Sequence, residues 1–335
     1  MERLQVFVRG LFEQAERHAL LCELVLVEWN PPSDKCKLRN AIKWPEGNRF
    51  CRGRIIEVSP AIHSRYKCST SLPLYQMIAK NVGIQRAVGD FVAATNVDVL
   101  FSDELFQFFK SSRLRQGEIY RVDRYDVDRS LPVWEPLENQ LRFCAENIVR
   151  VHSRFGTLVL GDGSYFPIYV NPALVNDDEV AYIAKSPDWP SCADRSSIEL
   201  PELHTNACGD FQLMARSHWQ ELKGYIELDA YSFHVDSLLG YAAYSAGLKE
   251  VCLGDPLRLY HVDHDGGFIA EASMKLEQIL ETRQLPRLSN EELYRMARRI
   301  VHERTPTCFG QELWGLSDLS LPEENVCNTE GAQVI

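Results

Sequence analysis

Three short stretches of the sequence carry residues that could bind a divalent cation or accept a proton. The first is Asn96-Val-Asp98, which directly follows an apolar run at 91–95. Carboxylate oxygen is a good ligand for Mg²⁺ and Mn²⁺, and ligands of open α/β sheets bind just beyond the carboxyl ends of strands. Asn and Asp are also common turn residues, so the same spacing fits an ordinary junction between a strand and a turn.

The second stretch contains two carboxylates that could act as a general base. Asp210 follows Cys208-Gly209, and Asp236 falls in the first turn of a predicted helix over 235–246. A carboxylate in a first turn is stabilised as an anion by the helix dipole, whether or not it has a catalytic role. Either aspartate could accept the proton of an attacking hydroxyl group.

The third stretch is a turn rich in histidine and aspartate. His261 and His264 are three positions apart, and two aspartates and a pair of glycines lie beside them. Imidazole is a common ligand of transition metals, so a site that includes a histidine favours Mn²⁺ over Mg²⁺. We prefer His261 as the ligand because it lies at the end of a predicted strand, and His264 is the alternative.

The elements around these stretches follow the pattern of an α/β domain. Apolar runs predict strands at 23–28, 54–58 and 91–95, and apolar residues at helical spacing predict helices at 3–18 and 72–87. This alternation predicts a mixed, mainly parallel central sheet flanked by helices.

The second half of the chain is less regular. Further candidate strands are 119–123, 157–160 and 165–170, and residues 171–205 read as a long loop. A capping box at Ser289–Glu292 predicts the start of a C-terminal helix. The acidic segment after about residue 315 is expected to be a mobile tail.

Composition excludes several classes of protein. The net charge of the 335-residue chain is −11, which argues against a nucleic-acid partner. The ten cysteines form no CxxC pair, which argues against a structural zinc site. Most of them lie in apolar stretches, which predicts buried, reduced thiols in a reducing compartment. No apolar run approaches the length of a transmembrane segment and no signal peptide is evident, so we expect a cytoplasmic protein.

Taken together, these motifs resemble those of a known family. The series Asn81-Val-Gly83, Asn96-Val-Asp98, His234-Val-Asp236 and a late His261 is similar to glycosyltransferases of the GT-A fold, both family-2-type and galactosyltransferase-like. The similarity covers roughly residues 20–265. In those families a helix with an Asn-x-Gly signature precedes a strand that ends in a DxD motif, and Asn96 here replaces the first acidic residue of that motif.

The resemblance implies a GT-A-like, nucleotide-diphospho-sugar-binding domain over 1–285, followed by a C-terminal helix and acidic tail over 286–335. GT-A domains begin with a strand that precedes the helix found here at 3–18. The resemblance therefore implies that this first strand is missing, and that the place beside the 23–28 strand is empty or filled by another segment.

The resemblance also implies a role for each site residue. Donor binding falls to Asn81, Arg86, Asn96 and Asp98. Asp98 also binds the metal, Mn²⁺ or Mg²⁺, whose shell is completed by His261 or else His264. The general base is Asp236, with Asp210 as the second candidate.

The expected reaction is metal-assisted transfer of a sugar from a nucleotide-diphosphate donor to an acceptor hydroxyl, with inversion. The acceptor is a glycan, a lipid or a small molecule. The alternatives are a sugar-nucleotide-binding protein with impaired catalysis, a nucleotidyltransferase and a structural partner domain. A nucleotidyltransferase would require a glycine-rich, basic phosphate loop near the N-terminus, and the sequence shows none.

Overall fold

Strands and helices alternate through the first hundred residues, as the sequence predicted. The structure is a computed structural model, and it describes residues 1–161, 164–170, 200–264, 276, 278–304 and 312–327. The helices are α1 (Glu2–Arg17), α2 (Leu38–Ala41), α3 (Pro60–His63), α4 (Gln76–Arg86), α5 (Asp103–Lys110), α6 (Leu137–Glu146), α8 (Arg216–Leu222), α9 (Val235–Ser245) and α11 (Asn290–Glu303), with a 3₁₀ helix η2 (Cys208–Asp210). The predicted loop over 171–205 lies outside the described residues as far as residue 199.

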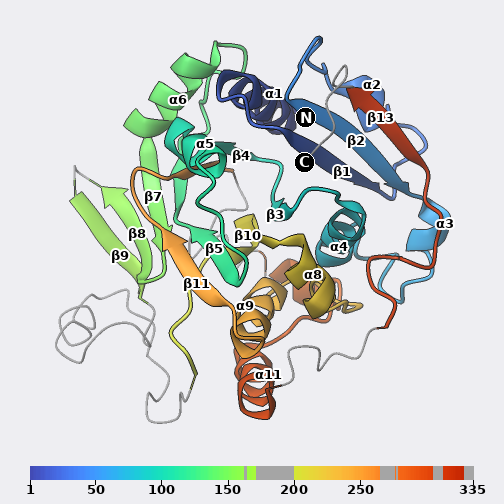
Figure 1. The fold of residues 1–335 in the computed structure, drawn as a ribbon. Helices are drawn as coiled ribbons and strands as arrows, with labels where there is room; N and C mark the ends of the chain where they lie inside the picture. The colour runs from blue at the N-terminus through green and yellow to red at the C-terminus, as the bar shows by residue number, and fades with distance from the viewer. Residues whose placement is uncertain (162–163, 171–199, 265–275, 277, 305–311, 328–335) are drawn as a thin grey trace.

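The strands form three mixed sheets. In chain order they are β1 (Cys22–Trp29), β2 (Cys51–Val58), β3 (Phe91–Thr95), β4 (Val99–Phe101), β5 (Glu118–Val122), β6 (Arg124–Val127), β7 (Ile148–Ser153), β8 (Gly156–Gly161), β9 (Ser164–Val170), β10 (Phe211–Ala215), β11 (Lys249–Leu253), β12 (Leu259–Val262) and β13 (Glu323–Cys327). The strand orders are β1-β2-β13, β11-β5-β10-β3 and β4-β12-β6-β7-β8-β9. In Figure 1 the β1-β2-β13 sheet and the β7-β8-β9 strands lie on opposite sides of the molecule.

The prediction of one central, mainly parallel sheet is wrong. Of the ten described strand pairings only β1–β2, β11–β5 and β12–β6 are parallel. The sequence analysis did not predict β6, although charged and apolar residues alternate along it. It also did not predict β4 or β10, because each is short and buried at every position. A strand buried on both faces lacks the alternation of apolar and polar residues that identifies a half-buried strand.

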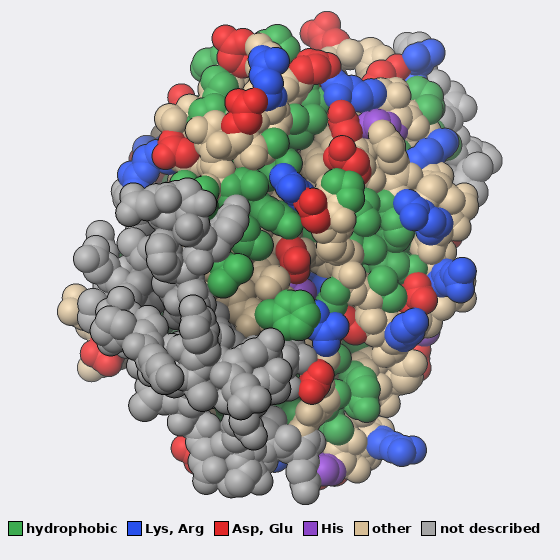
Figure 2. Space-filling model, turned by 90° about the vertical axis from the view of Figure 1, so that its left-hand side faces the viewer, with side chains coloured by type: hydrophobic (Ala, Val, Ile, Leu, Met, Phe, Trp, Pro, Cys, Tyr) green, Lys and Arg blue, Asp and Glu red, His purple; other side chains and the backbone are tan. Residues whose placement is uncertain are grey.

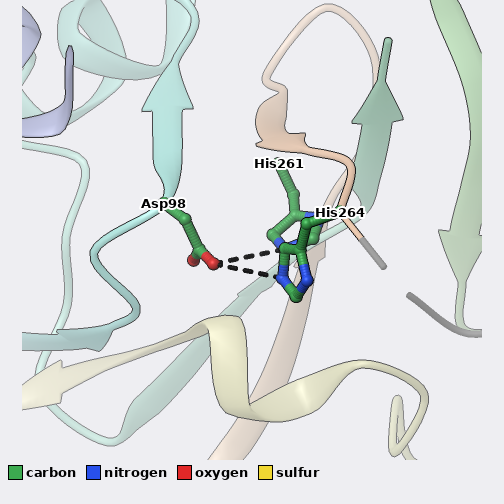
Figure 3. A group of neighbouring side chains, drawn as sticks. All are labelled: Asp98, His261 and His264. Carbon is green, nitrogen blue, oxygen red and sulfur yellow. Dashed lines mark ion pairs between the residues drawn. The ribbon is translucent and has the colours of Figure 1, made fainter. Parts of the chain in front are cut away.

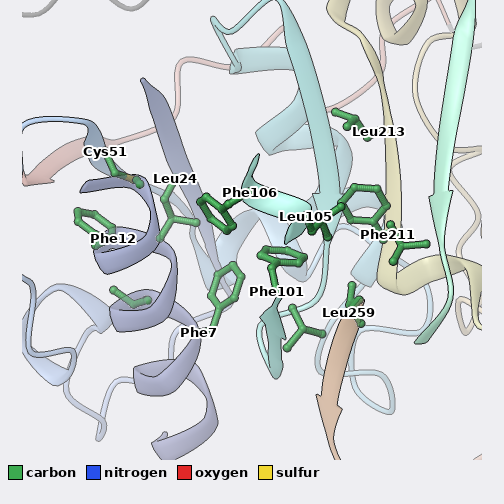
Figure 4. Packing of buried hydrophobic residues seen from close by; sticks show 14 of the residues in the cluster. Phe7, Phe12, Leu24, Cys51, Phe101, Leu105, Phe106, Phe211, Leu213 and Leu259 are labelled. Atoms are coloured by element: carbon green, nitrogen blue, oxygen red, sulfur yellow. The ribbon is translucent and has the colours of Figure 1, made fainter. Parts of the chain in front are cut away.

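A large apolar cluster joins the first sheet to the second and third. Phe7 and Phe12 of α1 pack toward Leu24 of β1 on one side and toward Phe101 on the other (Figure 4). The rings of Phe101 and Phe211 are 6.1 Å apart in an edge-to-face arrangement, which aromatic pairs favour. This cluster holds β4 and the start of β10 in place, and the candidate site residues Asp98 and Asp210 directly precede these two strands.

The first sheet is described on one side of β1 only. Among the described residues, β1 pairs only with β2, and β3 pairs only with β10. Thus no described strand occupies the other edge of β1.

Residues 312–327, the described part of the C-terminal segment, are packed against the rest of the structure and do not form the mobile tail that the sequence predicted. Trp314 is 4 % exposed and packs in the same apolar cluster as residues of α9 and α11. β13 then pairs antiparallel with β2, so the chain returns to the N-terminal sheet. The predicted capping box of α11 is present at Ser289 and Glu292. Contacts between described residues therefore cross residue 286, where the sequence analysis placed the boundary between the glycosyltransferase-like domain and the C-terminal segment.

The face shown in Figure 2 carries both apolar and charged side chains. In the view of Figure 2, apolar side chains gather near the middle of the face, and Lys and Arg are dispersed among Asp and Glu around them. None of the described helices is long and apolar enough to cross a bilayer.

Candidate metal centre

The register of the third sheet brings Asp98 and His261 together. β4 pairs antiparallel with β12, and His261 lies opposite Val99. Asp98 is the residue before β4, and its carbonyl accepts a hydrogen bond of 3.1 Å from the amide of Val262. The prediction that a late histidine lies beside Asp98 is therefore confirmed for His261.

Asp98, His261 and His264 point toward a common centre (Figure 3). Oδ2 of Asp98 lies 3.6 Å from Nε2 of His261 and 3.5 Å from Nε2 of His264. One ligand atom from each residue lies within 4.8 Å of the other two. Metal–ligand bonds are about 2 Å long, so neighbouring ligand atoms of a bound ion are about 3 Å apart. Small side-chain movements would close the three atoms around a cation.

The two oxygens of the Asp98 carboxylate differ in their contacts. Oδ2 faces both histidines, whereas Oδ1 is buried and has no hydrogen-bond partner among the described residues. A buried polar atom without a partner costs about 1–3 kcal/mol, and a cation bound by both oxygens of Asp98 would supply the missing interaction. Two imidazoles and one carboxylate suit Mn²⁺ better than Mg²⁺, and they are also the donor set of zinc and non-haem iron sites. The residues thus fit a divalent transition metal.

The electrostatics of the centre reflect its closely spaced charges. Burial alone would raise the pKa of Asp98, but the neighbouring His261 and His264 hold it well below its usual range. Burial alone would lower the pKa of His261, yet Asp126 and Asp98 raise it to about 9. His261 is therefore an imidazolium between two carboxylates, and a cation that bound this ring would have to displace its proton.

Asp126 is a residue of this site that the sequence analysis missed. It is fully buried on β6, and its Oδ1 lies 3.0 Å from Nδ1 of His261. Burial alone would raise the pKa of Asp126, but His152, His261 and Arg124 hold it well below its usual range. A sequence signal was present, because Arg124 and Asp126 alternate with Tyr125 and Val127, and charged residues at alternate positions of an apolar strand indicate a buried ion-pair network.

Asn96 and Asp210 are brought together, as the predicted site requires, but they bond to each other. Nδ2 of Asn96 donates to Oδ1 of Asp210, and Gln76 donates to Oδ1 of Asn96 at 3.0 Å. Oδ2 of Asp210 accepts from Arg124 Nη1 at 2.6 Å. Both oxygens of Asp210 therefore have donors. Asn96 was expected to bind the donor, and its amide is instead used to hold Asp210.

Asp236 lies in the first turn of α9, as predicted, and next to the segment that carries Asp210. Its Oδ1 accepts from the amide of Ser237 at 3.0 Å. Its Oδ2 lies so close to Gly209 that a Cβ at that position would come within 2.9 Å of it. The two candidate bases thus belong to one cluster, joined through Gly209.

Lys80 of α4 adds a positive charge to the same cluster. Its ammonium donates to the carbonyl oxygen of Gly209 at 2.5 Å. Burial lowers the pKa of Lys80, and the nearby charges of Asp210 and Asp236 act in the opposite direction. The sequence analysis assigned this lysine no role.

Asn81 was predicted to bind the donor, and the structure gives it another role. Its Nδ2 donates to the carbonyl of Tyr225 at 2.8 Å and to Glu227 at 2.9 Å, while its Oδ1 accepts from the amide of Tyr225 at 2.8 Å. Asn81 is fully buried, and Gly224, at φ +66°, is the residue that can pass this close to it. The polar atoms of Asn81 are used to fix the 224–227 turn, and this corrects the prediction.

Arg86 needs the same correction. Its Nη1 donates to the carbonyl of Gly315 at 2.7 Å, and its Nη2 donates to those of Leu316 and Leu319 at 2.8 and 3.1 Å. The guanidinium group therefore fastens the C-terminal segment to α4 and is not available to a donor phosphate.

A small hollow borders the site. The residues that line it are mostly apolar: Tyr75, Gln76, Met77, Ile78, Ile226, Leu228, Ala230, Ser232 and Val235. Gln76 at its edge is the residue that bonds Asn96, and Val235 precedes Asp236 in the chain. A ligand at the carboxylate cluster would therefore meet an apolar wall on this side.

Comparison of the sequence with protein-family models and with curated proteins gives no significant match. The function must therefore be inferred from the side chains that the fold brings together. Those side chains form a potential metal centre with two further carboxylates and an ammonium group beside it.

Proposed function

We propose that the chain is a metal-assisted glycosyltransferase that uses a nucleotide-diphosphate sugar as donor. The observation that supports this most strongly is the convergence of Asp98 with His261 and His264, which come from segments far apart in the sequence. The proposal also draws on the resemblance of the Asn-x-Gly and DxD-like segments to GT-A enzymes. We favour Mn²⁺ over Mg²⁺ because the donor set includes two imidazoles.

In this proposal the chain's own residues bind the donor and remove the acceptor's proton. Asp98, His261 and His264 hold the cation, which, when bound, offsets the charge that develops on the leaving diphosphate. Lys80 carries its charge beside these carboxylates, where its ammonium donates to the carbonyl of Gly209, and in this proposal it pairs with a phosphate oxygen of the donor.

Asp236 is the better candidate for the base. Both oxygens of Asp210 already accept hydrogen bonds, from Asn96 and Arg124. Oδ2 of Asp236 is the atom that lies against Gly209. As the acceptor oxygen forms its bond to the anomeric carbon, the bond from that carbon to the diphosphate oxygen breaks and the hydroxyl proton passes to Asp236. A single displacement of this kind inverts the anomeric configuration.

One observation favours a second candidate function, a sugar-nucleotide-binding protein with impaired catalysis. The DxD-like motif begins with Asn96, whose amide is bonded to Asp210 and Gln76. The cation would then have one carboxylate ligand from this motif instead of two. Binding of donor without turnover is the result that distinguishes this candidate.

The experiment is a screen of nucleotide sugars for metal-dependent binding and for release of nucleoside diphosphate. Mn²⁺, Mg²⁺, Zn²⁺ and Fe²⁺ are tested in parallel, and Asp98→Asn is compared with Asp90→Asn. Asp90 is exposed and precedes the same strand, β3, that Asp98 follows. We expect Asp98→Asn to lose metal-dependent binding and release, and Asp90→Asn to keep both. Failure of the wild-type protein to bind any nucleotide sugar with any of these metals would refute the proposal.

A further inference from the structure

We propose that Asp126 is a positioning residue of the metal centre, which holds the His261 ring so that Nε2 faces the cation. The inference rests on the metal centre of the proposed function, but it does not depend on which substrate the protein uses. It also assigns a function to a buried network that extends well beyond the three candidate ligands.

Sheet register places Asp126 beside His261. β6 lies between β12 and β7, and Asp126 is the register partner of His261 on one side and of Arg150 on the other. Side chains of register partners on neighbouring strands project from the same face of a sheet. The strand pairing therefore presents the Asp126 carboxylate to the inner nitrogen of His261.

The contact fixes which nitrogen of His261 carries a proton. Nδ1 lies 3.0 Å from Oδ1 of Asp126, and an ionised carboxylate can only accept, so Nδ1 is the donor. In the neutral ring the lone pair then belongs to Nε2, the atom 3.6 Å from Oδ2 of Asp98. A carboxylate that receives the outer N–H of a metal-binding histidine sets its orientation and raises its basicity.

The Asp126 carboxylate is itself held rigidly. Its Oδ2 accepts from Arg150 Nε at 2.8 Å and from Arg124 Nη2 at 3.2 Å, and it lies 3.0 Å from His152 Nε2. A carboxylate with this many donors has little freedom to rotate, so the ring of His261 is held in one orientation.

The same network connects the metal centre to a candidate base. Arg124 bonds Asp126 through Nη2 and Asp210 through Nη1, the latter at 2.6 Å. Both contacts come from one planar guanidinium group, which has a fixed fork geometry. Asp126 thus lies in a continuous path from His261 to Asp210.

The test is the affinity of the metal-free protein for Mn²⁺, measured by calorimetry without any substrate. Asp126→Asn should bind Mn²⁺ about 10–100-fold more weakly than wild type, as is usual when the carboxylate behind a metal-binding histidine is removed. Asp123→Asn is the matched control. Asp123 lies three positions away and pairs with the buried His204 at 3.1 Å, so it makes the same kind of contact with a histidine outside the metal triad. The control should keep its Mn²⁺ affinity within about twofold, since no metal contact depends on it.

A second measurement does not require the variant to fold. Wild-type protein loaded with diamagnetic Zn²⁺, which accepts the same nitrogen and carboxylate ligands, should show His261 with a protonated Nδ1 and a metal-bound Nε2 in ¹⁵N NMR of the imidazole ring. Metal bound through Nδ1, or equal Mn²⁺ affinity of Asp126→Asn and wild type, would overturn the positioning role. If wild type binds no divalent cation, the metal centre fails as well. If it binds Mn²⁺ but no nucleotide sugar, only the proposed function fails.

Discussion

Replacing His261 and His264 one at a time should separate metal binding from the stability of the fold. The two rings lie 5.2 Å apart and face the same carboxylate, but their surroundings differ. The side chain of His261 is 5 % exposed, whereas that of His264 is 35 % exposed. His261 also bonds the buried Asp126, whereas His264 lies at the edge of the cluster.

The expected magnitudes follow from these surroundings. His261→Ala removes a hydrogen bond to a buried carboxylate, for which we expect a loss of about 1.5–3 kcal/mol in the free energy of unfolding, and it leaves a cavity as well. His264→Ala changes a partly exposed side chain, for which the loss should be below about 1 kcal/mol. Each variant removes one of three protein ligands, so both should bind Mn²⁺ much more weakly than wild type.

Urea unfolding in the presence of a chelator measures the first effect, and calorimetric titration with Mn²⁺ measures the second. The reasoning predicts unequal losses of stability together with similar losses of metal affinity. Equal destabilisation by the two substitutions would contradict the described burial. Unchanged Mn²⁺ affinity in either variant would remove that histidine from the metal centre.

Three other outcomes follow from the same contacts. The pKa of His261 is about 9, against 6.5 in the unfolded chain, so in chelator its protonation stabilises the fold fully below pH 6.5 and this contribution is lost as the pH rises through 9. Urea unfolding across this window should show a smaller loss in the free energy of unfolding for His261→Ala than for wild type, and an equal loss would contradict the assignment. Gly209→Ala should displace the Asp236 carboxylate by a few tenths of an ångström, because the new Cβ would lie 2.9 Å from it, and should slow turnover about tenfold. In the control Gly254→Ala the new Cβ meets no atom within 4 Å, so this variant should turn over at the wild-type rate. Equal rates for the two variants would show that the position of the Asp236 carboxylate does not limit turnover. Arg86→Gln should release the 312–327 segment and speed its cleavage in limited proteolysis, and unchanged cleavage would show that other contacts hold the segment.

Much of the local structure could be predicted from the sequence, because its signals were local. The helix before β3 and the capping box of α11 depend on residues three or four positions apart. Asp98 was recognised because a carboxylate directly follows an apolar strand. The preference for the late histidines as its neighbours came from the same rule about strand ends.

The parts that could not be predicted depend on pairing between distant segments. The Asp126–His261 contact exists because β6 pairs with β12, and no local pattern specifies that register. Asn81 and Arg86 were assigned to the donor by motif, yet their partners, in the turn 224–227 and the segment 315–319, lie far along the chain. A motif identifies the residue type that a position requires, whereas the partners of its side chain are determined by tertiary packing.

The most direct test of the central claim is whether nucleoside diphosphate binds only together with the metal. Calorimetric titration of uridine, guanosine, adenosine and cytidine diphosphates into wild-type and Asp98→Asn protein, with Mn²⁺ and with chelator, measures this. The account predicts that wild type binds at least one of these nucleotides with Mn²⁺ and not in chelator, and that Asp98→Asn binds none under either condition. Binding of equal strength in chelator, or in Asp98→Asn, would contradict it.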